Sequence, residues 1–140
     1  MKMNMIHTQS YISEAKKIID AELTSLNKLT HYINQDFDAA CTYIMSCQGR
    51  VVVLGIGKSG HIGRKIAATL ASTGTPAFFV HPAEASHGDL GMITPQDVVL
   101  AISYSGESQE INLLIPYLKQ QKTPLIALCG NPNASLAKQA

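Results

Sequence analysis

The stretch Val51–Arg64, VVVLGIGKSGHIGR, decides the fold of this chain. It opens with four apolar residues, three of them valine, which is typical of a buried parallel strand. Three glycines follow within six positions, at Gly55, Gly57 and Gly60. From Ile62 onward, apolar residues recur at helical spacing. The stretch therefore predicts a strand, a glycine turn and a helix, in that order.

The turn between this strand and helix is the first candidate binding site. A helix that starts directly after such a turn leaves free backbone N–H groups at its first residues, and these groups favour an anion. Lys58 and Ser59 add a cation and a hydroxyl at the same place. We therefore expect the turn to bind a phosphate or another negatively charged group.

Three other interpretations of the glycine turn stay open. The glycines satisfy the G-x-G-x-x-G pattern of dinucleotide-binding proteins, but the next predicted strand ends at Val80 and His81 without the acidic residue that binds the ribose. A nucleotide triphosphate loop needs a glycine five positions before Gly57, where Val52 stands. The third alternative is a tight turn that binds no ligand.

Composition excludes several classes of protein. The chain has 140 residues, 46% hydrophobic and 15% charged, which suits one globular domain with a proper core. A formal net charge of +1 argues against binding to nucleic acid or to an anionic membrane. The first residues lack the apolar core of a secretory signal, so we expect a cytoplasmic protein. Its three cysteines lack C-x-x-C spacing, and we expect them to be reduced core residues.

Two helices are expected before the first strand. Residues 10–33 have apolar side chains near one helical face, including Ile19, Leu23 and Leu26. Asn34 and Asp36 offer a break and an N-cap, and a second helix is expected over residues 37–46. These helices could cover the sheet or contact a second subunit.

From residue 50 onward, strand and helix patterns alternate. Strands are expected at 51–55, 77–80, 97–102 and 124–128, and helices at 59–73, at 107–121 with an interruption at Pro116, and after Asn133. Gly74 is a natural residue to end the first of these helices. The alternation predicts an α/β fold, a three-layer α/β/α sandwich with a parallel sheet.

Ligands of such sheets bind beyond the carboxyl ends of the strands. Lys58 and Ser59 follow the first expected strand, the loop His81–His87 follows the second, and Ser103–Ser108 follows the third. We therefore expect these three segments to lie at one edge of the sheet. The stretch from His81 to Thr94 has the length of a functional loop.

The segment Ser103–Ser108, SYSGES, is the stronger of the candidate anion sites. Three hydroxyls and a glycine at a strand-to-helix turn can surround a phosphate without adding positive charge. The alternative is an ordinary helix N-cap at Ser105, with Glu107 favoured there by the helix dipole. Glu110 lies a full turn into the helix and could face the site as an acid or base.

The loop after the second strand brings together His81, Glu84, His87 and Asp89. Acid–base chemistry or the binding of sugar hydroxyls is the preferred interpretation. Two histidines alone do not make a metal site, and exposed loop residues without a function are the alternative.

Taken together, GIGKSGHIGRKIAATLASTGTPAFFVHPAEASHGDLGMI and ISYSGESQEI resemble the sugar isomerase (SIS) domain. More narrowly they resemble the arabinose 5-phosphate isomerases of the lipopolysaccharide Kdo pathway, with a match from about Tyr32 onward. The resemblance implies an N-terminal helical segment over 1–34 and a SIS domain over 35–140. It also implies the interconversion of D-ribulose 5-phosphate and D-arabinose 5-phosphate, a sugar phosphate as ligand, no cofactor, and a homo-oligomer, which is a tetramer in the full-length family.

The resemblance also assigns roles to single residues. It assigns phosphate binding to Ser59, Ser103, Ser105 and Ser108. It assigns catalysis to Lys58, which would stabilise an oxyanion, and to Glu110, which would move a proton. His87 would assist ring opening or bind a hydroxyl. The sugar site would be lined by Gly74, Thr75, His81 and His87. His81 also matches a position that takes zinc, which inhibits in this family and is not required.

This chain departs from the family at its carboxyl end. Members of the family that it resembles continue well beyond residue 140, complete the sheet, carry a further Glu and His, and usually add two CBS repeats, so we expect no CBS repeats within these 140 residues. We therefore expect an incomplete domain whose last helix has no packing partner, with exposed apolar surface beside the fourth strand. The alternative to an isomerase is a phosphosugar-binding module without catalysis.

Overall fold

The computed structural model describes residues 10–85 and 88–140, so His87, a predicted site residue, lies outside the described residues. The chain divides into two units, Met1–Ala39 and Ala40–Ala140. In the described part of the chain, no helix is both long and apolar enough to cross a membrane.

The first unit contains helix α1, Tyr11–Leu29, and a 3₁₀ turn, η1, Thr30–Tyr32. The α-helix thus ends four residues before the predicted end at residue 33. None of its residues is buried, and the predicted apolar face, including Leu23 and Leu26, is exposed. The predicted break at Asn34 is confirmed, because its side-chain oxygen accepts hydrogen bonds from the N–H groups of Asp36 at 3.0 Å and Phe37 at 3.3 Å. The next helix, α2, is Gln35–Met45.

The second unit is built on a parallel sheet, as predicted. Its strands are β1 (Val51–Gly55), β2 (Ala77–Val80), β3 (Val98–Ile102) and β4 (Leu125–Leu128). They lie side by side in the order β2-β1-β3-β4, and each neighbouring pair is parallel. This order matches the first four strands of a flavodoxin-like sheet.

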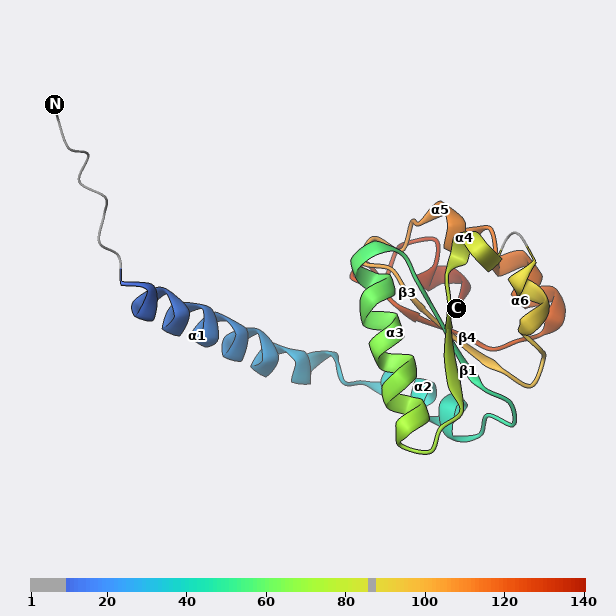
Figure 1. Ribbon diagram of the computed structural model, residues 1–140, viewed down its shortest axis with the longest axis horizontal. Helices are drawn as coiled ribbons and strands as arrows, with labels where there is room; N and C mark the ends of the chain where they lie inside the picture. Colours follow the sequence, from blue (N-terminus) through green and yellow to red (C-terminus); the bar gives the residue numbers. More distant parts are fainter. Residues whose placement is uncertain (1–9, 86–87) are drawn as a thin grey trace, which may run out of the picture. The chain divides into compact units, whose positions relative to one another are not determined.

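Helices cover both faces of the sheet, so the predicted three-layer sandwich is confirmed. Val51 and Val53 point to one face, where they pack with residues of α3, Gly57–Ser72. Val52 and Leu54 point to the other face because side chains alternate along a strand. There they pack with residues of α4 (Pro82–Ala85), α5 (Gln109–Asn112) and α6 (Ile115–Gln121). Figure 1 shows α3 on one side of the strands and α6 on the other.

Helix α3 lies unusually close to strand β1. A Cβ atom placed on Gly60 would lie 2.8 Å from the backbone oxygen of Gly55, a distance that real side chains do not adopt. Glycine at positions 55 and 60 therefore lets the first turn of the helix pack directly against the end of the strand. The helix runs to Ser72, and Gly74 follows with a φ of 98°, which confirms its predicted role at the helix end.

The segment after β3 folds as two short helices, and Pro116 explains the division. The predicted helix over 107–121 is interrupted between α5 and α6, with Pro116 in the first turn of α6. Proline is favoured there because its missing N–H group would have no helical partner anyway. The loop predicted over 81–94 also contains short helices, namely α4 and the 3₁₀ turn η2, Asp89–Met92.

The helix predicted after Asn133 is wrong. The chain forms turns there and a short 3₁₀ helix, η3, Ala137–Gln139. The cause is that the N–H groups of Ser135 and Leu136 bond to Glu107 and Gly106. The expected lack of a packing partner is also wrong, since Leu136 is fully buried. At β4 only Leu128 is exposed and the rest of the strand is half-buried, so the apolar surface at this edge is smaller than expected.

A buried carboxylate organises the amino edge of the sheet. Asp97 precedes β3, although it was predicted inside that strand, and it is 1% exposed. Its carboxylate accepts hydrogen bonds from the N–H groups of Arg50 and Thr94, each at 2.7 Å, and lies 3.7 Å from Nε of Arg50. These donors satisfy the charge that burial would otherwise penalise.

The three cysteines are free and half-buried, so the expectation that they are core residues is wrong.

The contact between α3 and β1 gives a first testable prediction. Gly60→Ala should destabilise the protein by about 1–3 kcal/mol, because the added methyl group forces the helix away from the strand. The free energy of unfolding, measured by urea denaturation, tests this. Gly91→Ala is the matched control, since a Cβ atom there meets nothing within 4 Å. Equal stability of the two variants would contradict the close approach.

Candidate functional site at the carboxyl edge of the sheet

The candidate site lies where neighbouring strands β1 and β3 end. Gly55, the last residue of β1, pairs with Ile102, the last residue of β3. From these ends the chain continues to opposite faces of the sheet, into α3 after β1 and toward α5 after β3. Such a divergence opens a crevice in which ligands of parallel sheets bind. The topology thus brings the Lys58–Ser59 turn and the Ser103–Ser108 turn to one place, as the sequence predicts.

An open depression of about 230 Å³ marks this place. Its lining consists of Ser59, Ile102, Tyr104, Leu128, Cys129 and Gly130. Ser59 was a predicted site residue, whereas Tyr104 and Cys129 were missed. Both missed residues come shortly after a strand. Ligands of parallel sheets bind beyond the carboxyl ends of the strands, so the argument that selected Ser59 could also have found Tyr104 and Cys129.

The start of α3 presents backbone donors without an intrahelical acceptor to this edge. Gly60 donates to the backbone oxygen of Ile56 at 3.2 Å, whereas the N–H groups that precede it in the helix have no intrahelical acceptor. Lys58 is exposed and Ser59 is half-buried. The backbone N–H donors, the Ser59 hydroxyl and the Lys58 ammonium group together provide the features of an anion site.

The segment of residues 103–108, called the serine turn below, is held in shape by its own hydroxyls. The Oγ atoms of Ser103 and Ser108 lie 2.8 Å apart, and the N–H group of Gly106 donates to Oγ of Ser103 at 3.2 Å. Ser103 is buried, so its hydroxyl shapes the turn from inside, whereas Ser105 is exposed and Ser108 half-buried. Ser108, and not Ser105, is the N-cap residue of α5. The alternative of an N-cap at Ser105 is therefore wrong.

Glu107 is bonded to the chain beyond β4. One carboxylate oxygen accepts a hydrogen bond from the N–H group of Ser135 at 2.7 Å. Hydrogen bonds from the side chain of Ser135 and then from its backbone lower the pKa of Glu107. Desolvation opposes them, and attraction from Lys138 adds a smaller lowering. Glu107 lies before α5 and not within it, so the expected interaction with the helix dipole is replaced by this bond.

His81 directly follows β2 and is half-buried. Its Nδ1 atom accepts a hydrogen bond from the N–H group of Ala83 at 3.3 Å, which assigns the proton of the neutral ring to Nε2. Among residues 10–85 and 88–140, no three His, Cys, Asp or Glu side chains form a group that could hold a metal ion. A zinc site at His81 stays a prediction, because His87 of the same loop lies outside the described residues. Glu84 and Asp89 are exposed.

Of the predicted site residues that the structure describes, only Ser59 lines this depression, and Gly74, Thr75 and Glu110 lie apart from it. Gly74 and Thr75 follow the far end of α3, and a helix of 16 residues is about 24 Å long. They lie near the amino ends of β1 and β2, where Pro76 accepts a hydrogen bond from Val51 at 2.8 Å. One chain therefore does not bring them to Lys58. Glu110 is exposed in the first turn of α5 and does not line the depression.

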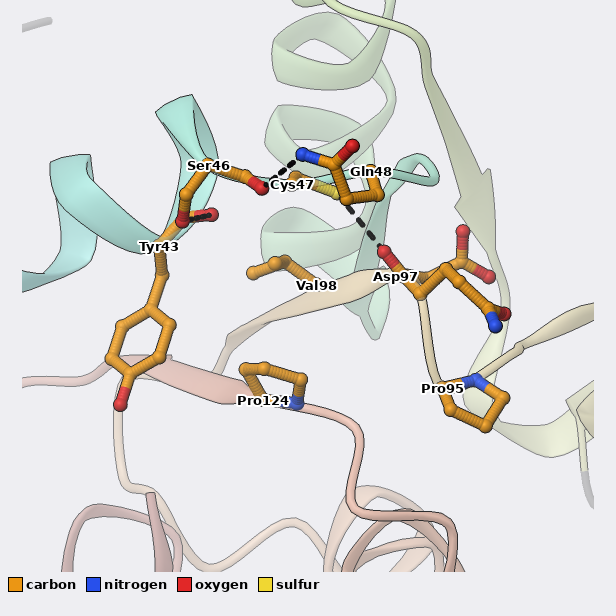
Figure 2. A pocket seen from close by; sticks show the side chains of 9 residues that line it. Tyr43, Ser46, Cys47, Gln48, Pro95, Asp97, Val98 and Pro124 are labelled. Carbon is orange, nitrogen blue, oxygen red and sulfur yellow. Dashed lines mark hydrogen bonds between the residues drawn. The ribbon is translucent and has the colours of Figure 1, made fainter.

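A second hollow, of about 290 Å³, lies at the opposite edge of the sheet. Figure 2 shows Tyr43, Cys47 and Pro124 around it, with Asp97 close by. The carboxylate of Asp97 is already bonded to Arg50 and Thr94, and Sγ of Cys47 lies 3.4 Å from the backbone oxygen of Gln96. None of the predicted site residues that the structure describes lines this hollow.

Comparison with known proteins identifies the family. The family model described as the SIS domain matches residues 44–140, more than half of the chain. This chain belongs to the SIS domain family. The α/β fold and the parallel sheet agree with that assignment, and the resemblance noted in the sequence is confirmed.

Two curated relatives are named arabinose 5-phosphate isomerase KdsD. The Yersinia pestis protein is 64% identical over 125 residues, which are 89% of this chain and 38% of the relative. The Pseudomonas aeruginosa protein is 54% identical over 138 residues, 99% of this chain and 42% of the relative. This SIS domain chain thus spans about two fifths of the length of these relatives. A solved structure, Escherichia coli CFT073 c3406 in complex with arabinose 5-phosphate, is 44% identical with a TM-score of 0.87, and the match covers 97% of this chain and 72% of that one.

The lowered pKa of Glu107 gives a prediction for this SIS domain. Because the pKa is lower in the folded state, the stabilisation from the ionised carboxylate is complete above the ordinary glutamate pKa and is lost as pH falls through the lowered value. In an NMR titration of the carboxyl carbon, Glu107 should titrate at lower pH in the folded chain than in a short peptide of the same local sequence. Equal midpoints would contradict the hydrogen bond to Ser135.

Proposed function

We propose that this chain belongs to an arabinose 5-phosphate isomerase, and that it supplies the phosphate-binding turns and part of the catalytic set. The observation that carries the proposal is the pairing of Gly55 with Ile102, which sets the start of α3 beside the serine turn. The 64% identity to a protein named arabinose 5-phosphate isomerase supports the choice of substrate. The reaction would interconvert D-arabinose 5-phosphate and D-ribulose 5-phosphate.

The phosphate group would bind between the two turns. The first N–H groups of α3 and the hydroxyls of Ser59, Ser105 and Ser108 would donate to its oxygens. Ser103 would act from inside the turn, since its hydroxyl is buried and already bonded to Gly106. Lys58 is exposed at the same helix start, where its ammonium group adds attraction for the anion.

Isomerisation moves one proton between neighbouring carbons of the sugar. A base takes the proton from C2 of the open-chain aldose, and the carbonyl oxygen of C1, on which negative charge develops, gains a proton to give an enediol. The C2 hydroxyl then loses its proton to become the new carbonyl, while C1 receives a proton, which gives the ketose. Lys58 would stabilise the charged oxygen, and Glu110 would take or return the proton. His87 would bind a sugar hydroxyl or assist ring opening. No cofactor is needed for these steps, and a cytoplasmic location stays a prediction.

A second copy of the chain would complete the site. Since α3 separates Gly74 and Thr75 from Lys58, they can line the same sugar site only if another copy contributes them. The exposed apolar face of α1, with Ile19, Leu23 and Leu26, is the surface we propose for contact between copies. A helix that buries none of its own residues gains stability from such a contact.

A binding module without catalysis is the second candidate function. The observation that favours it is the position of Glu110, which is exposed and does not line the depression beside Ser59. Under this alternative the chain binds the sugar phosphate but does not convert it.

Variants of Lys58 separate the two candidates. Lys58→Met should reduce kcat for arabinose 5-phosphate by about a hundredfold or more, because the developing oxyanion loses its cation. Lys65→Met, an exposed lysine two turns further along α3, is the matched control and should retain activity. Unchanged turnover in Lys58→Met would contradict its role. Tight binding by the unmodified chain without turnover would favour the binding module.

A further inference from the structure

The residues after β4 form an anchor for the serine turn. In this C-terminal segment, residues 131–140, Leu136 is fully buried and belongs to the same core cluster as Ile111 and Leu114. Ala134 is buried as well. The segment is therefore fixed to the core beside α5, although it contains no strand and only a short 3₁₀ helix.

Two hydrogen bonds join this segment to the serine turn. The N–H group of Ser135 donates to the carboxylate of Glu107 at 2.7 Å, and the N–H group of Leu136 donates to the backbone oxygen of Gly106 at 3.1 Å. The two partners are neighbours in the turn, and the two donors are neighbours in the segment. The contact thus fixes both the position and the direction of the turn.

Packing at Gly106 shows how closely the two pieces meet. Gly106 has a φ of 68°, in the left-handed region that glycine favours, and a Cβ atom there would overlap Cβ of Ala134. A side chain at this position would therefore push the segment off the turn.

Glu107 connects this anchor to a hydroxyl that the proposed function assigns to phosphate. Its backbone N–H group donates to Oγ of Ser105 at 3.2 Å, while its side chain is held by Ser135. Glu107 thus links the exposed hydroxyl of Ser105 to the C-terminal segment, whose Leu136 lies in the core. A carboxylate near a bound phosphate would normally weaken binding by like-charge repulsion, but here an N–H donor and the charge of Lys138 compensate it.

We infer that Glu107 is a positioning residue, which fixes the serine turn for phosphate by accepting the N–H hydrogen bond of Ser135. The inference rests on the proposed function, because the consequence for binding assumes that the turn holds a phosphate. It concerns the geometry of Ser105 and assigns Glu107 no contact with the sugar and no proton transfer.

The test compares Glu107→Ala with Glu107→Gln in this chain. Glutamine keeps a side-chain oxygen that can accept from Ser135, whereas alanine removes it. The dissociation constant of arabinose 5-phosphate, measured by calorimetry, should rise about tenfold or more in Glu107→Ala, since a hydrogen bond to a charged group is lost. In Glu107→Gln it should stay within about threefold of the original value, because an ordinary hydrogen bond remains. Glu22→Ala, at an exposed position in α1, controls for the removal of a carboxylate.

Amide hydrogen exchange provides a readout that does not depend on the ligand. Glu107→Ala should lose protection at Ser135 and Leu136, and Glu107→Gln should retain it. If Glu107→Ala does not fold, Glu107→Asp replaces it, because the shorter side chain withdraws the carboxylate from Ser135 and keeps the charge.

The outcomes separate the inference from the function on which it rests. If the unmodified chain does not bind arabinose 5-phosphate, the proposed function fails and the inference fails with it. If the unmodified chain binds and Glu107→Ala binds equally well despite lost protection at Ser135, the inference alone is overturned. Equal loss of binding in Glu107→Ala and Glu107→Gln would also overturn it, because charge and not the hydrogen bond would then be responsible.

Discussion

The close approach of helix α3 to strand β1 is the constraint on which the rest of the structure depends. Gly60 lies so near the backbone of Gly55 that a single added carbon would overlap it. This contact sets where α3 begins and therefore where its free N–H groups, Lys58 and Ser59 lie relative to the end of β1. Since β1 is a central strand, paired with β2 and β3, its end is also the meeting point of the segments that follow those strands.

The two halves of the candidate phosphate site are supported in different ways. The start of α3 is fixed by backbone packing against β1. The serine turn instead depends on hydrogen bonds, within itself through the Ser103 hydroxyl and outside itself through the bond between Glu107 and Ser135. The first half belongs to one strand–helix unit, whereas the second needs a segment that comes after three further elements along the chain, α5, α6 and β4.

Local patterns in the sequence predicted most of the fold. The run of valines located β1 to the residue, and Pro116 correctly marked the division between α5 and α6, because these features act on their immediate neighbours. The C-terminal segment was predicted wrongly as a helix. Its amides bond to Gly106 and Glu107, some 28 residues away for the pair Ser135 and Glu107, and no local pattern carries that information.

The candidate site was predictable to a similar extent. Parallel strands bring the turns at their carboxyl ends to one edge of the sheet, so Ser59 and the serine turn could be grouped from the sequence. The role of Glu107 could not be found, since it depends on a distant N–H group, and the far position of Gly74 and Thr75 becomes evident only from the length of α3. Tyr104 and Cys129, by contrast, come directly after strands and were within reach of the same rule.

The most direct test of the account is an amide NMR titration of this chain with arabinose 5-phosphate. The account predicts that the largest chemical-shift changes fall on residues 57–60 and 103–108, the two turns at the carboxyl edge of β1 and β3. Unphosphorylated arabinose at the same concentration should leave these amides nearly unchanged. Changes concentrated instead around Tyr43, Cys47 and Val98, in the hollow at the opposite edge, would contradict the central claim.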